Sequence, residues 1–471
     1  MASRSESSGD VTPPLKEDDL AVSVLDPDQH DRKDEGLAGE YPQEKIRVPL
    51  FRSTRFQAAV IAGVFFCGPG MYSALNALGA GGLRSPHLVN ITQSMSYGEN
   101  VLFALLTGVV VNIFGERLTL SAGVAGFSIY GASLYCNNRY GKSSSWFLYF
   151  SAALQGVLTA ILWVVQAAVM LAYPEPDFKG RFISIWYASI ACGQAVGGII
   201  ALGFNARNAE AGSITPNSYI PLIAIAGLGP FIALLLSSPA KVVRRDGVRV
   251  TSNKQSNPWQ EAKNVFSALK RREMVMLIPL FIFSQWFLSY NNNFTAIYHS
   301  VRGRSLSGFL SAVWGIAGTF SFGTFLDSKT GWGFAPTRAA RLRLSFYVIY
   351  ALYTMVWVWA TVVQWYYSKT HPVGLDWTDG EFYASFMLLL FWAFVDHAFQ
   401  TFMYATVGSL TDDVDELERY TGFLKAVNTG GAALGYAVQV EWSMMGSEAL
   451  LLGLWVIQIW PTWLVIRRLT K

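Results

Sequence analysis

Long apolar runs alternate with short polar stretches along most of the chain. A run of about 20 apolar residues spans the ~30 Å hydrocarbon core of a bilayer as a helix, whereas a membrane β-barrel shows ~10-residue segments of alternating polarity. The pattern therefore predicts an all-α membrane protein with twelve transmembrane helices. We expect the spans at residues 56–78, 99–115, 118–136, 146–172, 182–204, 219–237, 275–297, 306–326, 342–364, 382–410, 421–440 and 447–466.

Composition supports a membrane protein. Of the 471 residues, 52% are hydrophobic and only 14% are charged, which would leave a soluble protein of this size short of polar surface. Residues 1–50 differ, because they are rich in Ser, Asp and Glu and contain no apolar run. This composition predicts a disordered acidic tail on the cytoplasmic side.

The basic residues predict the orientation and the domains. Nine of the 36 Lys and Arg residues lie in the segment 238–274, which separates six predicted spans from six more. Because cytoplasmic loops carry an excess of Lys and Arg, we expect this linker and both chain ends in the cytoplasm. Residues 51–237 and 275–471 would each form a six-helix bundle, which is the plan of the major facilitator fold.

Asp396 lies in the middle of the predicted tenth span, and Gln400 follows one helical turn later. A carboxylate at this depth is costly unless it faces a cavity or a partner. Two interpretations fit: Asp396 titrates or pairs with a cation during transport, or it forms a structural hydrogen bond to a neighbouring helix.

The first span contains Gly68, Pro69 and Gly70. Proline removes a helix hydrogen bond, so these residues predict a break in the helix. In a fold of two related six-span halves, the first and seventh spans occupy equivalent positions. Breaks in both spans would point to a binding site between the halves. The alternative is a kink that serves packing alone.

The seventh span is interrupted by Gln285, Asn291 and Asn292. Consecutive amides point in several directions around a helix, so they either line a water-filled path or mark a segment that unwinds. Gln166 in the fourth span is a further candidate for the lining of a solute or ion pathway, and its alternative is a hydrogen bond between helices.

The remaining motifs add one modification and no catalytic site. Asn90 begins an Asn-Ile-Thr sequon that we expect in the first outer loop, where it would be glycosylated. The chain has three cysteines and five histidines, and neither set has the spacing of a metal site. The sequence therefore predicts no enzyme, no cofactor and no nucleic-acid partner.

Several dispersed motifs resemble the uncoordinated-93-like (UNC-93-like) family of the major facilitator superfamily, with fungal members as the best match. The resemblance covers about residues 50–440 and implies the major facilitator fold. The loop Gly115-Glu116-Arg117 departs from the pattern usual in other transporter branches. The motifs are residues 65–82, 112–120, 162–166, Tyr173-Pro174 with Lys179-Gly180-Arg181, and 395–398.

The resemblance implies two functions, because members of this family are known as presumed transporters, as trafficking partners of receptors and as regulators of potassium channels. The broken first span, the amides and Asp396 favour a secondary transporter of an unidentified small solute. The divergent loop and the acidic tail favour a non-transporting adaptor that regulates the trafficking or activity of another membrane protein or ion channel. Plasma membrane and internal membranes both fit the sequence.

Overall fold

The computed structural model of the chain describes residues 49–104, 106–173, 179–244, 263, 266–326, 328, 335–411 and 413–470. Nearly all of these residues lie in helices, and the strand pairing among them is limited to two isolated bridges. The predicted all-α fold is therefore confirmed. Nearly all of the predicted acidic tail and most of the predicted basic linker lie outside the described residues.

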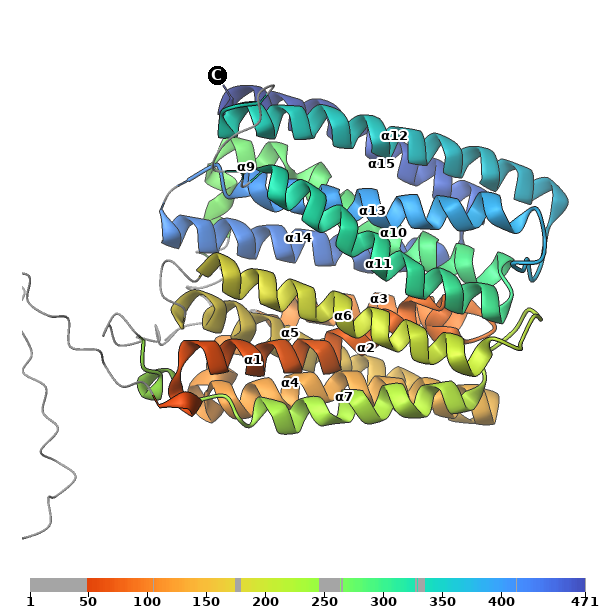
Figure 1. Cartoon of the computed structure of the whole chain (residues 1–471), viewed down its shortest axis with the longest axis horizontal. Helices are drawn as coiled ribbons and strands as arrows, with labels where there is room; N and C mark the ends of the chain where they lie inside the picture. Colours follow the sequence, from red (N-terminus) through yellow and green to blue (C-terminus); the bar gives the residue numbers. More distant parts are fainter. Residues whose placement is uncertain are drawn as a thin grey trace, which may run out of the picture. The chain divides into compact units, whose positions relative to one another are not determined.

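The longer helices follow the predicted spans closely (Figure 1). In chain order they are α1 (Thr54–Phe65), α2 (Met71–Ala77), α3 (Pro86–Ala104), α4 (Thr107–Tyr140), α5 (Ser145–Ala172), α6 (Lys179–Asn205), α7 (Tyr219–Ala233), α9 (Arg272–Met276), α10 (Ile278–Tyr298), α11 (Val301–Leu326), α12 (Arg338–Thr370), α13 (Phe382–Val407), α14 (Val414–Glu441) and α15 (Met444–Leu469). We call α1–α7 the N-terminal half and α9–α15 the C-terminal half.

Nine helical stretches of the described residues are long and apolar enough to cross a membrane, and one of them joins α4 to α5. The helices α3 and α14 are too polar to be among them. They lie side by side, where they join the two halves (Figure 1). Their polar side chains are thus directed in part at each other rather than at lipid. This explains why apolar content alone does not identify α3 and α14 as membrane-spanning helices.

The predicted start of the second span at residue 99 is wrong, because α3 begins at Pro86. The polar residues Asn90, Thr92 and Gln93 interrupt the apolar pattern, yet all three are buried against other helices. The predicted turn after this span is present inside α4. It lies at Gly115, whose φ of 73° is a conformation that side-chain-bearing residues rarely adopt.

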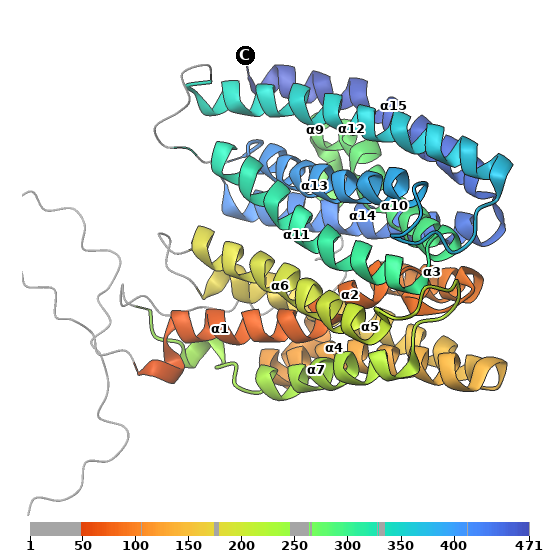
Figure 2. The ribbon, with the colours of Figure 1, turned by 45° about the vertical axis from the view of Figure 1, so that its right-hand side comes forward.

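Buried apolar side chains of the described residues form one cluster in the C-terminal half, one in the N-terminal half, and one that joins N-terminal helices to Ala296 and Val301. The core of the C-terminal half is aromatic, and its largest fully buried side chains are Trp357, Trp392 and Trp455. In Figure 2 the helices α12 and α15 run together at the edge of this half. Since lipid is as apolar as these side chains, close packing rather than water exclusion holds such helices together.

The two halves pack so closely that backbone atoms of one half lie next to the other half. The helix α11 lies beside α6 (Figures 1 and 2), and a Cβ on Gly198 of α6 would come 2.8 Å from the Cα of Phe309 on α11. A Cβ on Gly308 would come 3.2 Å from the Cβ of Ala77 on α2. Small residues therefore allow α11 to close tightly on the N-terminal half.

Candidate functional site

Three polar side chains form a connected group inside the N-terminal half. Tyr72 of α2 donates to Gln93 Oε1 at 2.7 Å, and Gln93 Nε2 donates to the Tyr130 hydroxyl at 3.0 Å. Gln93 and Tyr130 are fully buried. This chain of neutral groups links α2, α3 and α4 within the membrane.

A second group continues it across to the C-terminal half. Asn292 Nδ2 of α10 donates to the Tyr436 hydroxyl of α14 at 2.7 Å. The ring of Tyr97, on α3, stacks on Tyr436 with centroids 5.7 Å apart and planes 11° apart. We call the six residues of the two groups the central polar cluster, and its neutral hydroxyl, amide and ring surfaces can stack on a solute and hydrogen-bond to it.

Asp396 lies half-buried on α13 and faces α12. The Tyr353 hydroxyl donates to Asp396 Oδ1 at 3.4 Å and accepts from Trp392 Nε1 at 3.3 Å. Gln400 Nε2 donates to the Ser284 carbonyl of α10 at 2.8 Å. Both predicted residues therefore hold α13 to its neighbours inside one half, as the interhelical hydrogen-bond interpretation expects.

The amides of the seventh span have different surroundings. The helix α10 continues through residues 291–293, so this span does not unwind. Asn292 belongs to the central polar cluster, whereas the Asn291 Oδ1 is buried and accepts no hydrogen bond within the described chain. Gln285 is half-buried on α10 and Gln166 is buried on α5. Among the described residues, no hydrogen bond joins either glutamine to the other predicted site residues.

Gly68, Pro69 and Gly70 lie in a π-helical turn between α1 and α2 (Phe66–Gly70). A Cβ on Gly70 would come 2.8 Å from the Cα of Gly193 on α6, and one on Gly68 would come 2.4 Å from Val124 Cγ2 on α4. The wider turn thus accommodates Pro69 while its glycines admit two neighbouring helices. These contacts favour the packing interpretation of the motif.

The predicted position of Asn90 in an outer loop is wrong. Asn90 lies in α3, is 2% exposed, and its Nδ2 donates to the Gln439 carbonyl of α14 at 3.4 Å. A glycosyl acceptor must be reached from outside the fold. The side chain of Asn90 is therefore inaccessible for glycosylation in this fold.

Sequence reasoning missed a second carboxylate in the C-terminal half. Glu448 on α15 is fully buried, and the Thr361 hydroxyl of α12 donates to its Oε1. Its Oε2 accepts no hydrogen bond from any described residue. Position 448 is the second residue of the predicted span 447–466, where a charged residue is usually solvated, but α15 begins at Met444 and Glu448 lies inside the fold.

A buried arginine joins the halves at one end of the molecule. This end holds the loops after α2, α4, α6, α10, α12 and α14. The charge pattern predicts that it faces away from the cytoplasm, and we call it the outer end. Arg304 of α11 is fully buried and donates to the backbone carbonyls of Leu83 (3.4 Å) and Gly212 in the N-terminal half. Arg304 precedes the predicted start of its span at 306, so the apolar pattern gives no sign that its side chain is buried.

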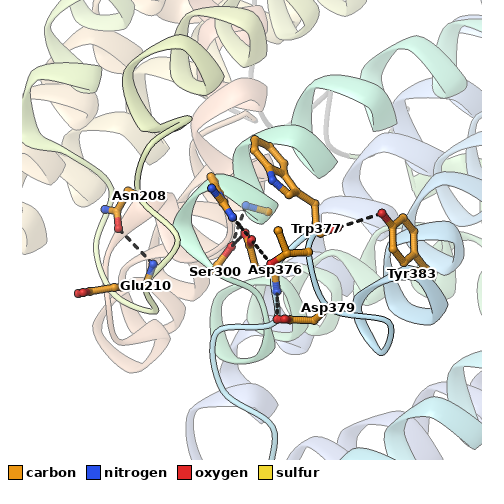
Figure 3. A network of polar contacts seen from close by, with 10 residues as sticks. Asn208, Glu210, Ser300, Asp376, Trp377, Asp379 and Tyr383 are labelled. Carbon is orange, nitrogen blue, oxygen red and sulfur yellow. Dashed lines mark hydrogen bonds and ion pairs between the residues drawn. The ribbon is translucent and has the colours of Figure 1, made fainter.

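Two backbone hydrogen bonds lie beside Arg304. Val301 N donates to the Glu210 carbonyl at 2.9 Å, and Arg302 N donates to the Asn208 carbonyl at 3.0 Å. The loop around Asn208 and Glu210 approaches the start of α11 in Figure 3. These bonds and the two from Arg304 attach the first turn of α11 to loops of the other half, and we call them the outer clasp.

The side chain of Arg302 turns the other way, to Asp376 in its own half. It donates two hydrogen bonds to the Asp376 carboxylate, which also accepts from Ser300 at 2.7 Å and from Thr378 at 3.0 Å (Figure 3). Burial alone would raise the pKa of Asp376, but the hydrogen bonds from Arg302, Ser300 and Thr378 outweigh it and hold the pKa well below its usual range. Asp376 therefore stays ionised and ties the loop before α13 to α11.

His299 follows α10 at the same end. It is fully buried and its Nε2 lies 2.8 Å from the Ser385 hydroxyl of α13. Burial, with a smaller contribution from the Arg304 charge, lowers the pKa of His299 to about 3. The imidazole is therefore neutral near pH 7, which avoids a second positive charge beside Arg304.

The opposite, inner end is joined by ring contacts. The Lys425 ammonium of α14 lies 4.6 Å from the centroid of the Trp163 ring on α5. The rings of Tyr187 on α6 and Tyr404 on α13 meet edge to face at 6.5 Å. These contacts also cross between the halves, without the backbone bonds of the outer clasp.

The chain matches the family model "Major Facilitator Superfamily" over residues 58–436. It is 31% identical over 414 residues to UNC93-like protein 1 of Arabidopsis thaliana, with 86% of this chain and 87% of that protein covered. It is 30% identical over 405 residues to notoamide biosynthesis cluster protein O' of Aspergillus versicolor, with 86% of each covered.

Solved structures agree on the fold. The D-xylose-proton symporter superposes with a TM-score of 0.56 at 13% identity, covering 88% of this chain and 96% of that one. The xylose transporter XylE from E. coli, partially occluded and inward open, gives 0.55 at 14% identity, covering 89% and 96%. At such identities the likeness shows the fold alone. Together with the two-half helical architecture, the matches show that this chain is a multi-pass membrane protein of the major facilitator superfamily and of its UNC93-like family.

Proposed function

We propose that this protein is a secondary transporter that moves a small solute by alternating access. The observation that supports the proposal most directly is the outer clasp, which closes one end of the interface above polar groups contributed by both halves. A transporter of this fold needs a site between two halves and an end that can open and close. The clasp and the central polar cluster are suited to these two requirements.

The clasp is of a strength that transport requires. It consists of four hydrogen bonds, two of them from the charged Arg304. At a net value of about 1 kcal/mol for each neutral bond and about 1.5–3 kcal/mol for each charged one, the four bonds favour the closed state by about 5–8 kcal/mol in an equilibrium between a closed and an open outer end. Such an equilibrium can be shifted by the differential binding of a solute.

Asp396 has a separate role in this proposal. Its position inside the C-terminal half, on a helix that lies against both α11 and α12, lets a change in its charge alter how these helices pack. We therefore assign Asp396 to coupling, by gain and loss of a proton or pairing with a cation during the cycle. The solute itself contacts the central polar cluster instead.

Distance measurements between spin labels test alternating access without knowledge of the solute. Cys67, Cys136 and Cys192 are free and are first replaced by alanine. Labels at Ser143→Cys and Thr370→Cys, both exposed at the outer end, report its opening. The protein in nanodiscs is expected to show a short and a long distance population, and Arg304→Ala should favour the long one.

Labels at Arg117→Cys and Arg338→Cys, both exposed, follow the inner end in parallel. Their distance should shorten when the outer distance lengthens. Arg302→Ala is the matched control, because its side chain bonds within one half and its backbone bond to Asn208 is retained. A single outer population that Arg304→Ala leaves unchanged would rule out alternating access through the clasp and favour a non-transporting adaptor.

A further inference from the structure

A small cavity at the outer end opens between helices of both halves. It has a volume of about 190 Å³ and lies among the first turn of α3, the last turns of α10 and α14, and the start of α15. Three amide side chains from three helices line it: Asn90, Asn293 and Gln439. Each is more than nine-tenths buried. We call it the outer amide cavity.

The amides of this cavity lack good partners. Asn293 Oδ1 is buried and accepts no hydrogen bond from any residue in the described part of the chain. Gln439 Nε2 donates to Met444 Sδ at 3.0 Å, and a thioether is a weak acceptor. The bond from Asn90 to the Gln439 carbonyl is long, at 3.4 Å. Since most buried polar groups are well paired, an open acceptor next to poorly used donors is suited to a bound molecule.

The lining also selects against charge. Among the described residues, its lining contains no Asp, Glu, Lys or Arg, and it includes Trp442 and His87. An ion placed there would lose water without meeting an opposite charge. A volume of 190 Å³ corresponds to roughly six water molecules at ~30 Å³ each, so the occupant is a small molecule.

The cavity leads towards the central polar cluster. Asn90, Gln93 and Tyr97 are spaced by three and four residues, which puts them on one face of α3. On α14, Gln439 lies one turn beyond Tyr436, and on α10, Asn293 follows Asn292. Polar groups thus continue from the cavity into the interface on all three helices.

We propose that the outer amide cavity binds a small neutral solute whose adjacent hydrogen-bond donors and acceptors match Asn293 and Gln439, such as a polyol or a primary amide. The role of the cavity as the first binding site on the solute's path rests on the proposed transport function. The binding of a neutral solute by its amide groups does not depend on that function. Hydroxyl and primary amide groups both donate and accept, so one such group satisfies the open acceptor and the weakly used donor together.

Equilibrium binding to the purified full-length protein in nanodiscs tests the proposal. The probes are two size-matched pairs, each with a neutral and an anionic member: radiolabelled glucose with glucuronate, and nicotinamide with nicotinate. At least one neutral member is expected to bind saturably, with its anionic partner at least about tenfold weaker. Asn293→Leu and Gln439→Leu should each weaken that binding about tenfold, the loss expected for one buried hydrogen bond.

Asn137→Leu is the control, because it removes an outer-end amide that bonds to Gly141 and Ser145 away from the cavity. Saturable binding by a protein whose spin-label distances show no exchange between open and closed ends would support the cavity and contradict the transport function. Exchange between the two ends without binding of either neutral probe would overturn the cavity and leave transport standing. Equal binding of neutral and anionic probes, or binding that neither leucine substitution weakens, also overturns it.

Discussion

The two ends of the interface between the halves are built from different contacts. At the outer end, backbone groups and the buried Arg304 form directional hydrogen bonds. At the inner end, Lys425 lies over Trp163 and Tyr187 meets Tyr404. Hydrogen bonds demand a specific geometry, whereas ring contacts tolerate sliding. If the proposed alternating access holds, we therefore expect the outer end to open as a distinct event and the inner end to adjust gradually.

The largest expected effect tests whether the contacts at the outer and inner ends of the interface are sufficient for transport. Asp396 takes part in neither set of contacts, since its partner Tyr353 lies in the same half. Asp396→Asn keeps the size of the side chain and removes its charge, so we expect solute flux in vesicles to fall by more than about a hundredfold, as for a residue required in each cycle. Because α13 packs on α11 and α12, loss of this charge should also change the proportions of the short and long outer distance populations. Unchanged flux would remove Asp396 from coupling.

The next largest effect separates the clasp from its neighbouring ion pair. Asp376 is 4% exposed and accepts bonds from Arg302, Ser300 and Thr378. Asp376→Asn removes the charge to which Arg302, Ser300 and Thr378 donate hydrogen bonds, so we expect the free energy of unfolding to fall. Thermal unfolding in detergent measures the loss. The outer distance should not change, and an opening comparable to that of Arg304→Ala would contradict the division between clasp and ion pair.

Packing of the halves near the clasp provides a third test. Gly198→Ala places a Cβ 2.8 Å from the Phe309 Cα, so α6 and α11 must separate. Such overpacking costs about 1–3 kcal/mol, which falls on the closed outer state alone. The labelled outer distance should therefore shift towards its long population. Gly203→Ala, on the same helix with open space around its Cβ, should leave the distribution unchanged.

Acidification gives a fourth test through His299. Its pKa of about 3 in the folded protein lies below its ordinary value near 6.5, so the unfolded chain takes up a proton first as the pH falls. The associated stability is complete above pH 6.5 and is lost progressively as the pH falls towards 3. Between pH 7 and 5 the loss is about 2 kcal/mol. The apparent melting temperature should fall in this range, and more gently in His299→Gln.

The smallest expected effect concerns the inner end. Lys425→Met retains much of the side-chain length and removes the charge over Trp163. A cation–π contact contributes about 0.5–2 kcal/mol, so the inner distance should lengthen only slightly. A shift as large as that caused by Arg304→Ala at the outer end would show that both ends are equally directional, against the comparison above.

The sequence predicted the fold because spans of this length leave a strong apolar signal, and the helices differ from the predicted ranges mainly at their ends. The errors at the candidate functional site arise from these misplaced helix ends. Arg304 and Glu448 lie at the limits of the predicted spans 306–326 and 447–466, where the apolar pattern does not show whether a charged side chain is buried. Asn90 was assigned to a loop because α3 is polar where it faces α14. Asp396, isolated in an apolar run, could be identified from sequence, but its partner Tyr353 comes from another helix and is visible only in three dimensions.

Arg304 bonds to main-chain oxygens, and this has a consequence for how relatives can diverge. Replacement of the side chain at Leu83 would leave the accepting carbonyl in place. The clasp therefore places no requirement on the side chain of Leu83, whereas Gly79, Gly81 and Gly82 of the same loop are restricted by positive φ angles and close neighbours. A one-residue deletion between 206 and 211 would move the Gly212 carbonyl away from Arg304, and would disturb closure more than many simultaneous replacements at the same positions.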